Sequence, residues 1–391
     1  MSSLHSYPDI AFIRVSNTSA FERGKYIGKQ TRLKVEHSLE TYQSMFAMCD
    51  ISWNQATEKA QAFINPIQQV SGELIDELSG IANGAGVDFN SVLALNCRTE
   101  ILPADFLSRA YDSVGLTPGT TSPNGPHANE CTSFAVARKN HPVWLVQNWD
   151  WCGRQREALC VVEQRNAKGL LFTTVTEAGM LAKIGLNAHG FGVTLNILRS
   201  ANDGLKSGLP VHVFLRALLN HETVNDAIAF AQTLTFASSS NVMVADKNGA
   251  IASMELSPEG MRVINSEQNR ICHTNHFLNN ELAKNDVGRP GNESTINRLH
   301  RAQSLVSADM SLNDIKQLLC NTSDGLESIC RFPDKRLPDI AQIETVTGVI
   351  MNLSTNTLEL SAAQPSVSNF CSYTVGSPSG NTTRGEHSAH N

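Results

Sequence analysis

Residues 129–150 read NECTSFAVARKNHPVWLVQNWD, and this stretch contains the change of pattern that decides the fold. Before Cys131 the chain is rich in proline, glycine, asparagine, serine and threonine, whereas after it apolar and polar residues alternate with a period of two. Because such alternation is typical of β-strands, we expect strands over Thr132–Arg138 and Val143–Trp149, joined by a turn at residues 139–142. A cysteine therefore stands where an irregular segment meets a hairpin.

Hairpins and helix pairs follow one another through the rest of the chain. Strand patterns recur over residues 159–164, 170–176, 181–186, 192–198, 241–245, 250–256, 261–264, 345–353 and 357–360. Helical patterns cover residues 210–219, 224–234, 294–306 and 311–319. This order is typical of an α+β fold in which helices cover sheets, and a four-layer αββα sandwich fits it. The pattern alone leaves other layered α+β folds open.

The first hundred residues have mainly helical patterns. One amphipathic helix is expected from Phe21 to Phe46, and others over residues 54–70 and 72–81. The glycines at positions 80, 84 and 86 are expected to close the last of these. A dinucleotide-binding loop is the weaker interpretation of these glycines, since that loop follows a strand. Three prolines predict an irregular loop over Ala104–Asn129.

The bulk properties limit the partners of the protein. Of 391 residues, 41% are hydrophobic, and the net charge is −6 with scattered lysines and arginines, so nothing suggests a nucleic-acid partner. No apolar run reaches the roughly 18 residues that span a bilayer, and residues 1–9 show no signal peptide, so we expect a cytoplasmic protein without membrane contact. Nine cysteines without a C-x-x-C pair exclude zinc ribbons and thioredoxin-like chemistry. The polar residues 377–391 are expected to be disordered.

Several short segments stand out by their order and spacing. They are ELSGIANGAG (77–86), NCRTE (96–100), CTS (131–133), QNWD (147–150), TEAG (176–179), GLNAHG (185–190), HTNH (273–276) and SICR (328–331). Together they resemble the penicillin (isopenicillin N) acyltransferase family, peptidase family C45, with the related β-alanyl-dopamine hydrolases. The resemblance runs from about Phe21 to Leu360. It implies an N-terminal-nucleophile hydrolase fold and self-cleavage before Cys131.

The chemistry of Cys131 explains why self-cleavage would be needed. A cysteine thiol with its ordinary pKa of about 8.5 is only partly ionised at neutral pH, so it requires a base. A free α-amine on the same residue has a pKa near 8 and lies within reach of the sulfur. In the uncut chain that nitrogen is an amide and cannot act as a base. Attack of the Cys131 sulfur on the carbonyl of Glu130 would give a thioester that water then opens.

The resemblance also implies roles for three further residues. Asn275 would donate its side-chain amide to the oxyanion, Asp150 would orient the nucleophile, and Arg331 would supply positive charge near the thiolate. Each residue has a simpler interpretation. His273 and His276 beside Asn275 could be a metal pair, although no third ligand is in view. Asp150 could be a turn residue at a strand end, and Arg331 a surface charge.

One position departs from the family pattern. Glycine usually precedes the nucleophile, whereas Glu130 precedes it here. Glycine tolerates the strained backbone that favours self-cleavage, so Glu130 would slow processing unless its carboxylate accepts a proton during the acyl shift. Both alternatives stay open at this point.

Three functions follow from these observations. The first is an amidohydrolase that cleaves a small N-acyl or N-β-alanyl amine through a Cys131 thioester, and the second is an acyltransferase that uses an acyl-CoA donor. The third is a small-molecule binding protein that has lost the chemistry. Either enzyme would consist of fragments 1–130, mostly helical, and 131–391, associated in one domain that could form homo-oligomers, whereas the binding protein would stay a single uncut chain. No cofactor and no metal is expected.

Overall fold

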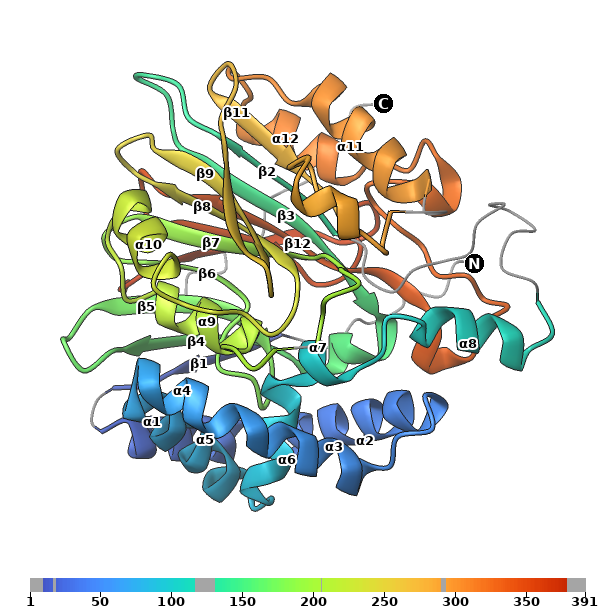
Figure 1. Ribbon diagram of the computed structural model, residues 1–391. Helices are drawn as coiled ribbons and strands as arrows, with labels where there is room; N and C mark the ends of the chain where they lie inside the picture. The colour runs from blue at the N-terminus through green and yellow to red at the C-terminus, as the bar shows by residue number, and fades with distance from the viewer. Residues whose placement is uncertain (1–9, 17–18, 117–130, 205, 290–292, 378–391) are drawn as a thin grey trace, which may run out of the picture.

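The computed structural model describes residues 10–16, 19–116, 131–204, 206–289 and 293–377 (Figure 1). Strands in these residues form two sheets. The larger sheet has the spatial order β1 (Ala11–Arg14), β4 (Leu159–Arg165), β5 (Leu171–Glu177), β6 (Ile184–Asn187), β7 (Phe191–Ile197), β8 (Ser240–Asp246), β9 (Ile251–Ser257), β10 (Gly260–Asn265). The smaller sheet has the order β11 (Arg270–His273), β2 (Cys131–Val136), β3 (Trp144–Cys152), β12 (Ile343–Asn352), β13 (Thr357–Ser361), β14 (Phe370–Thr374).

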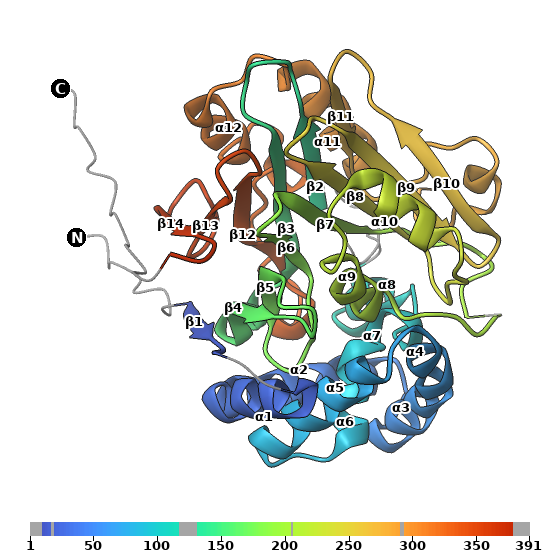
Figure 2. The same cartoon turned by 90° about the vertical axis from the view of Figure 1, so that its left-hand side faces the viewer.

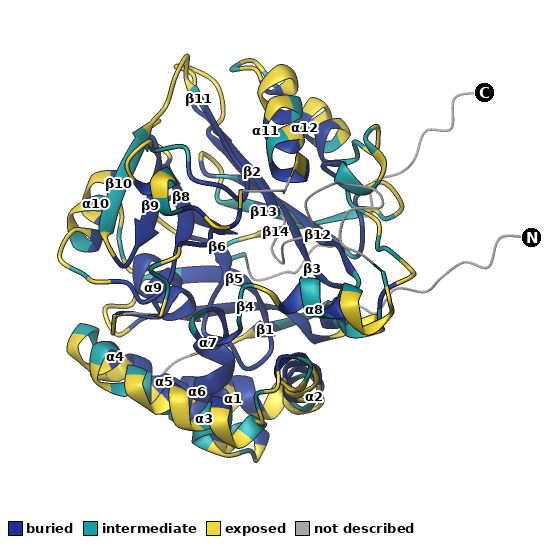
Figure 3. Ribbon diagram, turned by 45° about the vertical axis from the view of Figure 1, so that its right-hand side comes forward, coloured by how far each residue is buried: buried dark blue, intermediate teal, exposed yellow. Residues whose placement is uncertain are grey.

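The hairpin β2–β3 shows how period-two alternation positions the smaller sheet. Ala135 and Leu145 point inward and belong to the main hydrophobic core between the sheets. Phe134 and Val146 point outward and pack in a second core under helices α11 (Glu293–Leu305) and α12 (Leu312–Leu319). Both faces of these strands are therefore buried, as the dark strands of Figure 3 show.

The larger sheet has a helical layer of its own. Helices α9 (Val211–Leu218) and α10 (Val224–Ala231) lie on the side of this sheet that faces away from the smaller sheet (Figure 2). The order of layers is thus helices, larger sheet, smaller sheet and helices. The expected α+β four-layer αββα sandwich is confirmed.

The N-terminal residues add a group of helices below the larger sheet (Figure 1). They are α1 (Ala20–Gln30), α2 (Arg32–Met48), α3 (Trp53–Ala60), α4 (Ile64–Val70), α5 (Gly72–Ala85), α6 (Phe89–Asn96) and α7 (Arg98–Ile101). Helix α8 (Phe106–Ser113) lies to the right of this group in Figure 1. Helices α1 and α5 pack with their backbones in close approach. A Cβ atom added to Gly80 would lie 2.1 Å from the carbonyl oxygen of Phe21. Gly80 and Gly84 are thus packing residues within a helix, whereas Gly86 caps it in the left-handed conformation.

Three local predictions were wrong. The helix expected over Phe21–Phe46 is divided at Thr31, whose side chain bonds to the Ile27 carbonyl. The helix expected to end at Ile81 continues to Ala85, because Gly80 and Gly84 allow the close contact with α1, and of the expected closing glycines Gly86 alone caps it. The loop expected over Ala104–Asn129 contains α8, since Phe106, Leu107 and Ala110 form a buried stripe at helical spacing.

Short strands without a full alternation pattern were also missed. Strands β1, β11 and β14 have only four or five residues each, and each pairs with a neighbouring strand of its sheet. Strand β1 pairs with β4 in parallel and adds a strand to the N-terminal part of the chain. The cleavage-site residue Glu130 and residues 378–391 of the expected tail lie outside the described residues.

Candidate active site

Cys131 is the first residue of β2 and is only 4% exposed. It stands directly opposite Trp149 of β3 in the antiparallel ladder. Residues two apart in a strand share a face, so Cys131 points the same way as Ser133 and the inward-facing Ala135. The hydroxyl of Ser133 reaches across to Asn196 of β7 in the other sheet over 2.6 Å. The thiol therefore belongs to the space between the two sheets.

Three side chains from distant parts of the chain hold the backbone of Cys131. Its N–H donates to Oδ1 of Asn275, which follows β11, over 2.6 Å. Its carbonyl oxygen accepts from Nη1 of Arg298 on α11 over 2.7 Å and from Nδ2 of Asn196 over 3.1 Å. Arg298 also donates to Oδ1 of Asn275 over 3.2 Å and to Oγ1 of Thr132 over 3.1 Å. Both backbone polar groups of the candidate nucleophile are thus fixed by buried partners.

Asn275 is held at both ends of its side chain. Its Nδ2 donates to the carbonyl of Ile197 over 3.0 Å, and its backbone N–H donates to Oγ1 of Thr295 over 2.8 Å. The oxygen of the amide faces the Cys131 nitrogen, which fits because that N–H needs an acceptor. One of the two Nδ2 hydrogens remains for a second acceptor, such as the oxyanion that the sequence analysis expected.

The histidines beside Asn275 are bonded within the protein. Nε2 of His273 lies 2.8 Å from Oε1 of Glu255, and Nδ1 of His276 lies 3.0 Å from Oγ1 of Thr295. Burial lowers the pKa of His276 to about 3, so this ring is neutral. Within the part of the chain that the structure describes, no group of three or more His, Cys, Asp and Glu side chains could hold a metal ion.

Asp150 lies on β3, one residue after the partner of Cys131, and is 1% exposed. Its Oδ1 accepts a hydrogen bond from Oγ1 of Thr345 over 2.6 Å, and Oδ2 has no hydrogen-bond partner among the described residues. Burial raises the pKa of Asp150 to about 8, while the nearby Arg298 opposes this rise. The carbonyl oxygen of Asp150 lies 3.8 Å from Sγ of Cys131. Asp150 thus contacts the sulfur through its backbone.

The thiol of Cys131 is difficult to ionise in its present surroundings. Burial raises its pKa to about 11, and the carboxylate of Asp150 adds to the rise. The positive charge of Lys183 acts in the opposite direction. A thiol of this kind is almost fully protonated at neutral pH, so it would need a base within reach before it could attack a carbonyl.

The structure places Arg331 next to Asp150 by its backbone. Its N–H donates to Oγ1 of Thr345 over 2.8 Å, the same hydroxyl that bonds Asp150. Its side chain is half-buried, and the charges that act on its guanidinium are those of Tyr111 and Asp334. The arginine that bonds directly to Cys131 is Arg298. The expected positive charge near the nucleophile therefore comes from a residue that the sequence analysis did not name.

The sequence analysis did not name three residues near Cys131, although the sequence contains a weak indication of each. They are Arg298, Asn196 and Lys183. Arg298 lies on the buried side of α11 with Leu299, where a fully buried arginine requires bonding partners. Asn196 alternates with apolar residues in β7, a position that normally indicates a solvent-facing side chain. Lys183 interrupts an apolar run directly before β6. These signals mark buried polar groups, but they do not say which distant residue each one meets.

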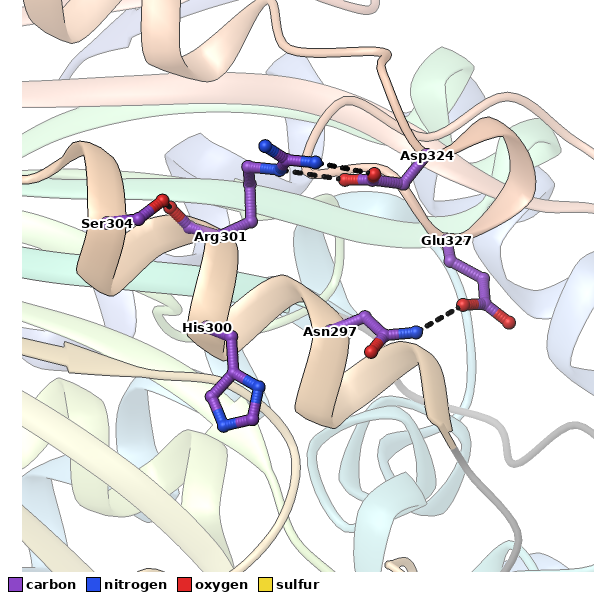
Figure 4. Close-up of a pocket in the computed structure, with 6 residues that line it drawn as sticks. All are labelled: Asn297, His300, Arg301, Ser304, Asp324 and Glu327. Carbon is purple, nitrogen blue, oxygen red and sulfur yellow. Dashed lines mark hydrogen bonds and ion pairs between the residues drawn. The ribbon is translucent and has the colours of Figure 1, made fainter.

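A surface depression of about 540 Å³ lies on the outer side of α11 (Figure 4). It is lined by Asn297, His300, Arg301, Ser304, Asp324 and Glu327. Its polar groups are bonded to one another, with Arg301 2.8 Å from Asp324 and Asn297 2.7 Å from Glu327. Arg298 points to the other side of the same helix, toward Cys131. The depression and the candidate nucleophile thus lie on opposite sides of α11.

The four-layer αββα sandwich is the fold of the N-terminal-nucleophile hydrolase class, and Cys131 stands at the start of one of its inner strands. Within this class, the chain belongs to the acyl-coenzyme A:6-aminopenicillanic acid acyl-transferase family, whose family model matches residues 136–366. The family resemblance inferred from the sequence is confirmed. The match contains Asp150, Asn275 and Arg331 and begins after Cys131.

One curated relative and two solved structures show how far the similarity extends. The chain is 29% identical over 237 residues to the acyl-coenzyme A:6-aminopenicillanic-acid-acyltransferase 40 kDa form of Emericella nidulans. The aligned region covers 57% of this chain and 59% of that protein. It is similar to penicillin V acylase from Agrobacterium tumefaciens (TM-score 0.43, 14% identity, 62% of this chain and 86% of that chain). It is also similar to a variant of conjugated bile acid hydrolase from Clostridium perfringens (TM-score 0.40, 12% identity, 63% and 97%).

No helix in the described ranges has both the length and the apolar character needed to cross a membrane.

Proposed function

We propose that this chain is a self-processing cysteine amidohydrolase whose nucleophile is Cys131 after cleavage of the Glu130–Cys131 bond. The observation that supports the proposal most directly is the 2.6 Å hydrogen bond from the Cys131 nitrogen to Oδ1 of Asn275. An enzyme of this class uses that nitrogen as its base, so the nitrogen must be held in a defined direction. Any buried backbone N–H needs an acceptor, so the support comes from the identity of the acceptor, which is the side chain that the family resemblance assigns to the active site.

The same contact explains how the free amine could work after processing. A neutral α-amine carries two hydrogens and one lone pair. If one hydrogen keeps the bond to Oδ1 of Asn275, the amine is oriented and its lone pair remains available for the thiol proton of Cys131. Transfer of that proton produces the thiolate, which attacks the amide carbonyl of the substrate. The amine of the substrate leaves with a proton from the ammonium group, and water then opens the thioester.

Self-cleavage would use the same sulfur in the uncut chain. The Cys131 sulfur attacks the carbonyl carbon of Glu130, and the C–N bond breaks as its nitrogen takes up a proton. The product is a thioester that water hydrolyses. The bonds of Arg298 and Asn196 to the carbonyl of Cys131 hold the residue on the other side of the scissile bond in place. A fixed nucleophile reduces the entropy cost of this step.

The substrate that we propose is a small N-acyl or N-β-alanyl amine. Water is the default acceptor for a thioester, whereas an acyltransferase must also bind an amine and exclude water. Transfer from an acyl-CoA donor to an amine is the second candidate function, and the description of the matching family favours it. Both reactions use the same thioester and differ in the group that attacks it.

Two measurements test the proposal. Intact mass of the purified protein should give fragments 1–130 and 131–391, and Cys131→Ala should give one uncut and inactive chain. The processed protein should release free amine from β-alanyl-dopamine, β-alanyl-histamine or simple N-acyl amines. Chromatography measures the amine that is released. Normal processing of the Cys131→Ala variant would disprove the proposal that Cys131 is the nucleophile. Acyl-CoA-dependent acylation of an added amine, without amine release from any amide, would select the transferase.

A further inference from the structure

Lys183 is a buried cation next to the candidate nucleophile. It is 3% exposed, and its Nζ lies 3.5 Å from the centre of the Trp149 ring. Trp149 is the residue directly opposite Cys131 in the β2–β3 ladder. Side chains at directly opposite positions have Cβ atoms about 5 Å apart, so the ammonium group and the sulfur flank the same stretch of sheet. An ammonium group on an indole face is held by the ring quadrupole, which fixes its position.

The charges around Lys183 leave a positive excess on this side of the sulfur. Nζ of Lys183 lies 3.9 Å from Oε2 of Glu177, and the same oxygen accepts from Nη2 of Arg98 over 3.1 Å. One carboxylate is therefore shared between two cations. Its other oxygen accepts from the hydroxyl of Tyr42 over 2.6 Å and from Nε2 of Gln155 over 2.9 Å, so Glu177 is fully occupied.

The remaining titratable group near Lys183 does not offset this charge. Burial lowers the pKa of His212 on α9 well below its ordinary value, so its ring is neutral. The group that faces Lys183 from β2 is Cys131 itself. Among the described residues, the ionisable groups that act on Lys183 are thus Glu177, Arg98, His212 and Cys131, and the carboxylate of Glu177 is already paired.

We propose that Lys183 is a positioning residue for the proposed reaction, whose ammonium group stabilises the thiolate of Cys131. The inference rests on the proposed function and adds to it the cation that acts on the sulfur from inside the core. Arg298 bonds to the carbonyl oxygen of Cys131 and fixes the backbone, whereas Lys183 acts on the charge of the side chain. Burial lowers the pKa of Lys183, while the negative charges of Glu177 and of the Cys131 thiolate oppose this fall and favour the ammonium form.

The test measures the ionisation of Cys131 directly. The processed protein is treated with iodoacetamide between pH 6 and pH 12, and the peptide that begins at Cys131 is quantified by mass spectrometry. In Lys183→Met the pH midpoint of alkylation should rise by about 1 unit or more, because a nearby opposite charge is lost. Lys183→Arg should keep the midpoint close to that of the parent. The loss of amide hydrolysis in Lys183→Met should appear in kcat, with KM nearly unchanged.

Tyr42→Phe is the matched control, because it removes a hydrogen bond from the same Glu177 carboxylate without changing any charge. An unchanged midpoint in Lys183→Met, or an equal shift in Tyr42→Phe, would overturn the proposal. Lys183→Gln provides a second neutral variant if the methionine variant does not fold. The alkylation readout needs no substrate, so it separates failure of this inference from failure of the proposed amidase activity, which amine release by the parent measures.

Discussion

The side-chain oxygen of Asn275 accepts a hydrogen bond from the backbone nitrogen of Cys131 over 2.6 Å. The two residues are far apart in the sequence, and they meet because β11 pairs with β2 and ends beside the start of that strand. If the Glu130–Cys131 bond is cut, this nitrogen becomes the amine that accepts the thiol proton. Asn275 would then direct the base and could also offer its remaining Nδ2 hydrogen to the oxyanion.

Asn275→Ala should therefore lower kcat by about 10²-fold or more, with little change in KM, because the lost contacts act mainly in the transition state. Steady-state kinetics on the processed enzyme measures both constants. Asn275→Asp keeps an acceptor for the Cys131 nitrogen and removes the donor. If the aspartate variant is as active as the parent, the oxyanion role is wrong. A loss confined to KM would make Asn275 a substrate contact.

Glu130→Gly should be processed at least as fast as the parent. The backbone before the nucleophile must distort during the acyl shift, and glycine adopts strained conformations at lower cost than glutamate. A time course of precursor disappearance on denaturing gels measures the rate. Markedly slower cleavage would show instead that the carboxylate of Glu130 takes part in the reaction.

Glu77→Ala should lower the free energy of unfolding by about 3 kcal/mol or more, because it leaves buried cations without their carboxylate. Oε2 of Glu77 lies 2.9 Å from Nη2 of Arg216, and Oε1 accepts from Gln164 over 2.8 Å. These bonds join α5 to α9 and β4, so they would also connect the two fragments after processing. Urea unfolding and size-exclusion chromatography measure the effect. Glu58→Ala at an exposed position is the control and should change neither result.

Gly80→Ala should destabilise the contact between α1 and α5. The added methyl group would lie 2.1 Å from the carbonyl oxygen of Phe21, so the helices would have to move apart at a cost of about 1–3 kcal/mol. Gly72→Ala on the same helix is the matched control, since nothing lies within 4 Å of its added Cβ. Thermal melts compare the two variants. Equal melting temperatures would show that the close backbone approach is not required.

Asp150 should make the protein less stable as the pH rises toward 8. Burial raises its pKa from 3.8 to about 8 in the folded state, so the folded protein holds a proton that the unfolded chain releases. The stabilising contribution is complete below pH 3.8 and is lost as the pH rises to about 8. Asp150→Asn, compared with its parent in a Cys131→Ala background, should lose less stability between pH 5 and pH 8 in urea unfolding. Identical pH profiles would contradict the raised pKa.

The sequence by itself determined the order of the elements and the position of the candidate nucleophile. Period-two alternation around Thr132–Arg138 is a local property, because successive side chains of a strand must point to opposite faces wherever that strand lies. The change of pattern at Cys131 and the short segments from residue 77 to residue 331 were therefore sufficient for the fold class and the family. Short strands such as β11 contain too few residues to show alternation. These residues form a strand because they pair with a neighbouring strand in the folded protein.

Only the tertiary structure decided which polar groups meet at Cys131. Asn196, Arg298 and Lys183 come from β7, from α11 and from the residue before β6, and no spacing along the chain relates them to the cysteine. All three side chains are buried, and burial requires each of them to find a partner. Which partner each one finds depends on the packing of the layers, because that packing brings a strand of the larger sheet and a helix over the smaller sheet, both distant in sequence, to Cys131.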